Sequence, residues 1–383
     1  AGLGSATWHA AEANRARERA ERALATSERV RAFLADMFNG GNRHDVFSTT
    51  VMLSELLDQG LRQSEQLRDQ PVVRAQVLEE IGRVYFNRGE YGQAEDVFRR
   101  VVALRETAIG PAAPATAIAL RQLGDAVRRG LRYDEAEALY TRALAIQRET
   151  AGERHPDYAD VLVGLASLAT LRGDLQAALS LHERILDIRR SAFGPEDPAV
   201  AEALRLLAVT RRRLGDYPGA TSLYVDALEL RQKIHGRDSP EAARAMVHLA
   251  DQYHPHNGDP ASAEPLYEEA IRVLRARLGS GHPTLLHPLH SLASLREHMG
   301  EVEAAGELLR ESLEIVRRNY GERSWRMASA VDMLGTHYRA RGDYHRAEEM
   351  HRRALAMFEQ LYPRTHRYPL SARANLIRLY LAS

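Results

Sequence analysis

Apolar residues along this chain recur at spacings of three and four, the period of an α-helix with one buried face. One such stretch runs from Ala159 to Leu168, and a second runs from Leu175 to Leu186. Gly173 and Asp174 separate them, because glycine can adopt the left-handed conformation that ends a helix and aspartate can cap the next one. The pattern predicts a helix A, a tight turn, a helix B and a looser turn.

This helix pair repeats with a period of 42 residues. The position at the start of helix B is alanine in each of seven repeats: Ala94, Ala136, Ala178, Ala220, Ala263, Ala305 and Ala347. Glycines mark the looser turn in a second phase: Gly110, Gly152, Gly194, Gly236, Gly279 and Gly321. The spacing lengthens once, to 43, and we place the extra residue around positions 254–257. A fixed period predicts a solenoid of stacked units, for which binding is the default function.

Two further marks follow from helix packing. Prolines at the expected first turn of helix A, where a missing N–H costs nothing, are Pro114, Pro156, Pro198, Pro240 and Pro283. The repeated alanine allows helix A and helix B to approach closely. The bulky residues four positions later, Phe98, Tyr140, Tyr224 and Tyr267, are predicted to be core rather than a ligand site.

These marks resemble the tetratricopeptide repeat in its 42-residue form, the form of kinesin light chain. The resemblance rests on Leu-Gly or Leu-Ala pairs such as Leu123-Gly124, on the G-x-Y-x-x-A turn of Gly215 to Ala220, and on G-x-x-H-P at Gly152 to Pro156. It implies an all-α fold, an α-solenoid (TPR superhelix) of seven repeats over residues 71–363. It also implies that a protein or peptide partner binds the face lined by the A helices.

The ends depart from the repeat. Residues 1–47 are predicted to form a charged helix with a heptad seam over residues 7–38, followed by a loop, and residues 48–70 a further helix. The seam is small-residue-rich, so it either packs along the first repeats or forms a homodimeric coiled coil. Residues 364–383 are predicted to be an unpaired helix A that caps the last repeat.

The N-terminal part carries a second resemblance. Trp8 to Ala13, Val30 to Leu34, Asp69 to Ala75 and Gly82 to Tyr85 are similar to a juxtamembrane segment and first repeat of bacterial membrane-anchored serine/threonine protein kinases. This implies that the chain is the sensory or interaction region of such a kinase, possessing no kinase motif itself and lying outside the cytoplasm. The alternative is a free-standing cytoplasmic adaptor of the same fold.

Composition narrows the function. Lysine plus arginine and aspartate plus glutamate are equal, at 52 each, so no net basic field attracts nucleic acid. Cysteine is absent, which excludes disulfides, thiolate metal sites and cysteine nucleophiles. No apolar run reaches the roughly 18 residues that span a membrane. With no catalytic motif visible, we expect neither an enzyme nor a cofactor.

Arginines on the A helices are the candidate binding residues. Repeat 2 offers Arg121, Arg128 and Arg129, and repeat 4 offers Arg205, Arg212 and Arg213. Guanidinium groups pair bidentately with carboxylates, which predicts an acidic peptide partner. The alternative is that Arg128, Arg129, Arg212 and Arg213 sit in last helical turns, where cations favour the helix dipole.

Histidines are concentrated in repeats 5 and 6 and supply a second group of candidate residues. His248 and His290 fall at expected groove positions and join the candidate peptide-binding residues. His287 and His290 lie one helical turn apart, which leaves a metal site or enzyme in these repeats as a remote alternative. No acidic residue completes a ligand set from sequence, so we expect no metal.

Overall fold

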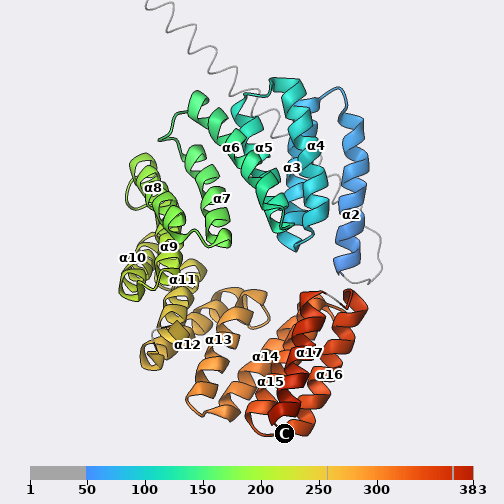
Figure 1. Ribbon diagram of the computed structural model, residues 1–383, viewed down its shortest axis with the longest axis vertical. Coiled ribbons are helices and arrows are strands. Elements are labelled where there is room, and N and C mark those ends of the chain that lie inside the picture. Colours follow the sequence, from blue (N-terminus) through green and yellow to red (C-terminus); the bar gives the residue numbers. More distant parts are fainter. Residues whose placement is uncertain (1–48, 257, 365, 383) are drawn as a thin grey trace, which may run out of the picture. The chain divides into compact units, whose positions relative to one another are not determined.

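The computed structural model describes residues 49–256, 258–364 and 366–382, and Figure 1 shows their arrangement. Within these residues the chain forms sixteen α-helices and no strand, which confirms the all-α fold. The heptad seam of residues 7–38 and the loop after it lie outside the described residues, so the homodimer stays a prediction. The first described helix, α2 (Thr49–Ser64), ends in a 3-10 turn, η1 (Glu65–Leu67).

Seven helix pairs follow. Four of the five predicted prolines begin a helix A, whereas Pro283 begins a 3-10 turn, η3 (Pro283–Leu285), that leads into α13. They are α3 (Pro71–Arg88) with α4 (Tyr91–Ile109), α5 (Pro114–Arg129) with α6 (Tyr133–Thr150), α7 (Pro156–Arg172) with α8 (Leu175–Phe193), α9 (Pro198–Arg213) with α10 (Tyr217–His235), α11 (Pro240–Asp251) with α12 (Pro260–Leu278), α13 (Leu286–His298) with α14 (Val302–Tyr320), and α15 (Trp325–Ala340) with α16 (Tyr344–Leu361). The unpaired helix α17 (Arg367–Ala382) packs on α16.

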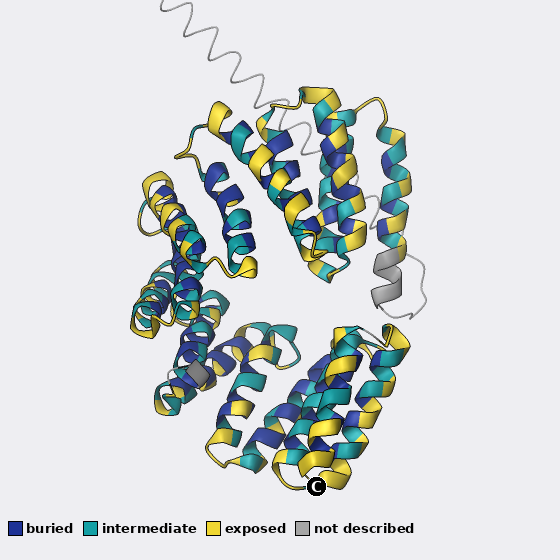
Figure 2. Cartoon of the chain, viewed as in Figure 1, coloured by how far each residue is buried: buried dark blue, intermediate teal, exposed yellow. Residues whose placement is uncertain are grey.

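The helices divide into two compact units between Ile188 and Arg189, within α8. The N-terminal unit contains α2 to the middle of α8, and the C-terminal unit contains the remaining helices to α17. In each unit the buried residues lie where neighbouring helices meet and the exposed ones on the outer sides, as Figure 2 shows. The core of each unit is therefore a set of helix interfaces rather than one central cluster.

The turns form as their residues dictate. Gly173 ends α7 in the left-handed conformation, at φ 84°. Asp174 then caps α8, where its Oδ1 accepts from the Ala177 N–H at 3.0 Å. Asp216, Asp259 and Asp343 do the same at the starts of α10, α12 and α16. These caps satisfy backbone donors that a helix start would otherwise leave without partners.

The one extra residue of the repeat lies in a π-helical turn. This turn, η2 (Gln252–His256), follows α11, and His254 leaves the helical conformation within it, at φ −132° and ψ 131°. A π-type turn accommodates one residue more than an α-helical turn. The period of 43 between Ala220 and Ala263 is thereby absorbed before Asp259 caps the next helix.

The close approach of the helices explains why small residues recur at the same positions in successive repeats. Every one of the seven marker alanines is fully buried. Tyr140, four residues after Ala136, fills the space between α5 and α7: a Cβ at Gly124 would lie 2.8 Å from its ring, and one at Gly164 would lie 2.5 Å from it. Small residues on the A helices therefore make room for the large side chain of the B helix.

We expect Ala220→Leu to destabilise the C-terminal unit by about 1–3 kcal/mol, because the added atoms overpack the contact between α9 and α10. The measurement is urea unfolding followed by circular dichroism. Ala276→Leu, at an exposed position in the last turn of α12, is the matched control. Equal midpoints for the two variants would show that the alanine is not held for packing.

Candidate functional site

Two of the three arginines of repeat 2 have partners within their own helix pair. Asp125 lies 3.2 Å from Arg121 and 3.4 Å from Arg128. The same carboxylate accepts from the Tyr140 hydroxyl at 2.7 Å, and Arg128 donates to that hydroxyl at 3.2 Å. Burial, followed by the charge of Asp125, raises the pKa of Tyr140. One carboxylate thus contacts three groups, and both arginines are held by contacts within the repeat.

The arginines at helix ends do not gather into one site. Arg129 is exposed and lies 5.7 Å from the ring of Tyr91, a cation–π contact. Arg213 is exposed in the last turn of α9, and Arg212, one residue earlier, acts electrostatically on Tyr224. Their positions agree with the alternative that cations favour the carboxyl end of a helix.

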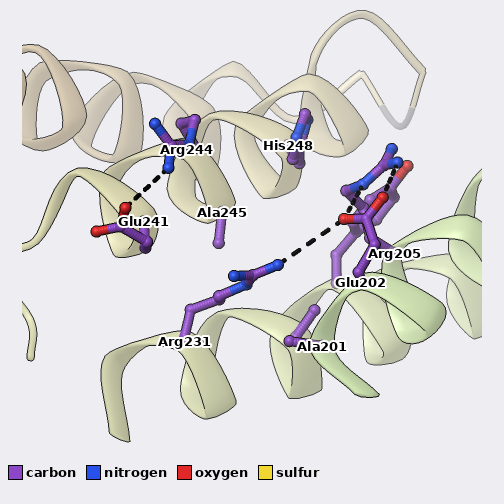
Figure 3. Close-up of a pocket in the computed structure, with 10 residues that line it drawn as sticks. Ala201, Glu202, Arg205, Arg231, Glu241, Arg244, Ala245 and His248 are labelled. Carbon is purple, nitrogen blue, oxygen red and sulfur yellow. Dashed lines mark hydrogen bonds and ion pairs between the residues drawn. The ribbon is translucent and has the colours of Figure 1, made fainter. Parts of the chain in front are cut away.

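The structure brings two predicted residues, Arg205 and His248, into one pocket of the C-terminal unit. The pocket has a volume of about 320 Å³ and lies among α9, α10 and α11 (Figure 3). Its lining comprises Ala201, Glu202, Arg205, Tyr224, Ala227, Arg231, Glu241, Arg244, Ala245 and His248.

Positive charge is in surplus in this pocket. Arg205 donates through Nε and Nη2 to the two oxygens of Glu202, at 3.0 and 2.5 Å, so these two groups form a bidentate pair. Arg244 pairs with Glu241 at 3.0 Å. Arg231, which points from α10 toward Glu202 in Figure 3, comes only within 3.9 Å of a carboxylate that Arg205 already occupies.

His248 adds no charge to the pocket at neutral pH. Burial, followed by the charge of Arg205, lowers the pKa of His248 to about 4. Glu202 stays ionised: burial raises its pKa, but the hydrogen bonds and charge of Arg205 outweigh burial and lower it. Three arginines therefore face two glutamates in the lining.

The pocket recurs along the repeat, and an equivalent in the N-terminal unit is nearly closed. That site has a volume of about 50 Å³, and Arg105, three repeats before Arg231, lines it. There the Arg105 guanidinium donates to the Ala115 carbonyl at 2.6 Å and pairs with Glu79. The position of Glu79 is Arg205 in repeat 4. A cation at that position cannot draw Arg231 inward, which explains why this pocket stays open.

A second open pocket lies one repeat further, with a volume of about 380 Å³. It shares Arg244 and His248 with the first, so the two pockets meet on α11. Leu274 takes the place of Arg231 in its wall, which makes this wall apolar. At its edge Arg326 lies 4.3 Å from the ring centre of Tyr320, and among the described residues it has no carboxylate partner.

His290 is not part of either lining. Its Nε2 lies 2.9 Å from the Ser312 hydroxyl, and burial, followed by the charge of His287, lowers its pKa to about 4. His287 instead faces Asp251, at 3.5 Å. Within the described parts of the chain no group of three or more His, Cys, Asp or Glu has the geometry to hold a metal ion.

Arg231 could have been found from the sequence, because it occupies a recurring position on helix B, which an analysis of the A helices alone does not include. Eleven residues after each marker alanine the helix B positions read Arg105, Gln147, Arg189, Arg231, Leu274, Val316 and Phe358. Arg105 and Arg189 both donate to a carbonyl in the first turn of the next helix A. The arginines of this series mark a polar contact between repeats, and among the three Arg231 is the one for which the described residues show no such carbonyl contact. Glu202, Glu241 and Arg244 were missed although their three-residue spacing was readable in the sequence: Arg205 pairs with Glu202 within α9, and Arg244 pairs with Glu241 within α11.

Comparison with known proteins decides the family. A tetratricopeptide repeat model matches residues 73–149, 129–191, 157–233, 199–276 and 281–360. The chain belongs to the tetratricopeptide repeat family. No curated protein matches it.

Solved structures agree on the fold of this tetratricopeptide repeat protein. BtubC (BKLC) from P. vanneervenii is 21% identical and has a TM-score of 0.51, covering 62% of this chain and 95% of its own. TPR-like repeats assigned to a kinesin light chain of Podosopora anserina are 24% identical, with a TM-score of 0.47 and coverage of 54% and 98%. A tetratricopeptide repeat protein from Parabacteroides merdae is 20% identical, with a TM-score of 0.49 and coverage of 80% and 98%. Of these three, the BtubC structure, with a TM-score above 0.5, supports the fold.

The comparisons do not extend to the kinase resemblance of residues 1–110, which stays a prediction. Across the part of the chain that the structure describes, no helix combines the length and the apolar character needed to cross a membrane.

Acid should destabilise the protein through the two low-pKa histidines. His248 and His290 are held neutral in the fold, with pKa values near 4, but take up protons near pH 6.5 when unfolded. The unfolded state binds more protons between these values, so the free energy of unfolding falls as the pH drops from 6.5 to 4. Between pH 6.5 and pH 4, we expect the free energy of unfolding of the His248→Gln, His290→Gln double variant to decrease by roughly 1–3 kcal/mol less than that of the parent.

Urea unfolding at a series of pH values measures this effect. His345→Gln, at an exposed position, is the matched control and should follow the parent. A double variant whose stability falls with pH as steeply as the parent's would contradict the assignment.

Proposed function

We propose that this chain is a non-catalytic scaffold that binds an acidic segment of a protein partner in the pocket lined by α9, α10 and α11. The single observation that carries the proposal is Arg231, a largely buried arginine whose nearest carboxylate among the described residues is 3.9 Å away and already paired. Family membership supports a protein-interaction role, and the open pocket supplies the place.

The binding residues that we propose differ in part from those that the sequence alone favoured. Arg205 holds Glu202 and therefore shapes the pocket, whereas Arg231 is available to a ligand carboxylate. Arg244 is half exposed and pairs only with Glu241 on its own helix, so a ligand carboxylate can replace that partner. A guanidinium binds a carboxylate with two parallel hydrogen bonds, which favours aspartate or glutamate side chains or a chain terminus. Arg121 and Arg128 already share Asp125, so the proposal assigns them to the packing of repeat 2.

The finer assignment is the interaction region of a membrane-anchored bacterial serine/threonine kinase, with a free-standing cytoplasmic adaptor as the alternative. The resemblance of residues 1–110 supports the first. Kinase motifs and a membrane helix in the reading frame before Ala1 would favour it, and an adaptor would have neither. The pocket proposal holds for both.

We expect Arg231→Ala and Arg244→Ala each to weaken binding of acidic peptides to the full chain by about 1–2 kcal/mol, or roughly tenfold in Kd. A peptide array of acidic, neutral and basic 12-residue sequences, about the length of an extended segment that crosses three A helices, selects the probe. Fluorescence anisotropy then measures its Kd. Affinity should also fall with salt, because partly exposed ion pairs are screened.

Arg213→Ala is the matched control, since this arginine is exposed at the end of α9 and does not line the pocket. Helicity should stay unchanged in all three variants. An array that enriches neutral or basic peptides, or pocket variants that bind as tightly as the control, would overturn the acidic ligand.

The closed pocket of the N-terminal unit supplies a further prediction. Arg205→Glu restores the residue type of Glu79 at its equivalent position and should draw Arg231 inward, as Arg105 is drawn. We expect this variant to lose acidic-peptide binding at least as fully as Arg231→Ala. Arg205→Gln, which cannot form the charged pair, should retain more affinity. Equal binding by the two variants would show that Arg231 does not respond to this position.

A further inference from the structure

The last helix exposes an apolar seam on the side away from the protein. Leu370, Ile377 and Leu381 of α17 are 50%, 58% and 83% exposed, and Ala374 lies between them. Their spacings of four, three and four place all four on one side of the helix. The opposite side, with Pro369, Ala372, Leu376 and Leu379, is buried. α17 is therefore apolar on two faces, only one of which the fold covers.

This seam is not shaped for an eighth helix B. Ile377 occupies the position of Gly335 in the preceding repeat, one residue after the repeat's leucine. At Gly335 even a Cβ would lie 2.8 Å from the ring of His351, because helix B approaches so closely. An isoleucine side chain excludes that approach. Whatever covers the seam must pack at a wider spacing, as helices with large residues between them do.

The edges of the seam are basic. Arg367 and Arg378 flank it on one side and Arg373 on the other, and no aspartate or glutamate occurs from residue 360 to 383. Arg373 is paired with Glu359. Arg367 and Arg378 contact a tyrosine hydroxyl and an asparagine, and within the described residues neither has a carboxylate partner. On the Arg373 side, Tyr380 donates to Glu348 at 2.7 Å, and Glu348 is itself paired with Arg352.

The positive charge beside the seam and the narrowness of the seam together indicate which kind of partner can cover it. A second copy would bring like-charged arginines against one another, which opposes self-association. A membrane surface suits a broad apolar face, whereas a stripe one residue wide with 3-4 spacing is the seam of helix-on-helix packing. We propose that α17 docks an amphipathic helix of a partner protein through Leu370, Ile377 and Leu381, with acidic residues of that helix facing Arg367 and Arg378. This surface is separate from the pocket of α9, α10 and α11.

Two designed helical peptides of about 20 residues test the proposal, a length at which a helix can be stable. Both carry leucines at spacings of four, three and four, one flanked by glutamates and the other by lysines. Fluorescence anisotropy with the full chain should show the glutamate peptide binding at least about tenfold more tightly than the lysine peptide. Leu370→Ser with Ile377→Ser should weaken glutamate-peptide binding by tenfold or more. Arg367→Gln with Arg378→Gln should reduce the preference between the peptides to below about threefold.

The substituted side chains are exposed, so the thermal midpoint should match the parent's. His345→Gln, at an exposed position outside α17 and outside the pocket lining, is the control and should leave glutamate-peptide binding unchanged. Equal binding of both peptides, or none, overturns the proposal. So does a mass by light scattering that doubles with concentration and reverts in the serine variant, which would make a second copy the occupant. Binding of the parent, but not the serine variant, to phosphatidylserine vesicles in preference to the glutamate peptide would assign the seam to a membrane surface and likewise overturn it.

Discussion

The close approach of helix A and helix B is the constraint on which the rest of this structure depends. A fully buried alanine lies in the first turn of each helix B, and a glycine or alanine follows a leucine, or isoleucine in the first repeat, of each paired helix A. The space they leave receives one large side chain per pair, as Tyr140 shows between Gly124 and Gly164. Because each unit contacts only its neighbours, this local packing rule is enough to build the stack. The apolar positions are thereby committed to packing, and the remaining polar positions of the A helices are free to vary.

Those polar positions either link neighbouring repeats or line a pocket. Some join one repeat to the next: Gln122 donates to Glu79 at 2.7 Å, and Asn375 donates to Asp332 at 2.8 Å, in each case 43 residues apart. The position that holds Gln122 and Asn375 thus links neighbouring repeats. A pocket opens where such a link is absent, as it is when Glu79 gives way to Arg205 at the equivalent position.

The fold was readable from the sequence because its marks recur in register. Alanine, glycine and proline each determine local structure, and their recurrence in up to seven repeats makes the helix pairs recognisable. The extra residue also lies where the sequence placed it, in the π-helical turn after α11. The site was readable only in part. Arg205 and His248 were found, but the neutralisation of Arg121 by Asp125 and of Arg205 by Glu202 was not, because the choice of ion-pair partner depends on side-chain direction. Arg231 was missed since its role depends on a residue 26 positions earlier, on another helix.

The same packing rule limits what can pack against α17. In the other A helices a glycine or alanine at this position admits a close helix B, whereas α17 has Ile377 there. A helix that served only to cover the preceding repeat would expose polar residues, as the outer faces of capping repeats do. Instead the uncovered side of α17 carries leucine and isoleucine between arginines. The residue that excludes a close helix B is thus also the centre of an exposed apolar surface, so both features follow from one substitution in the packing rule.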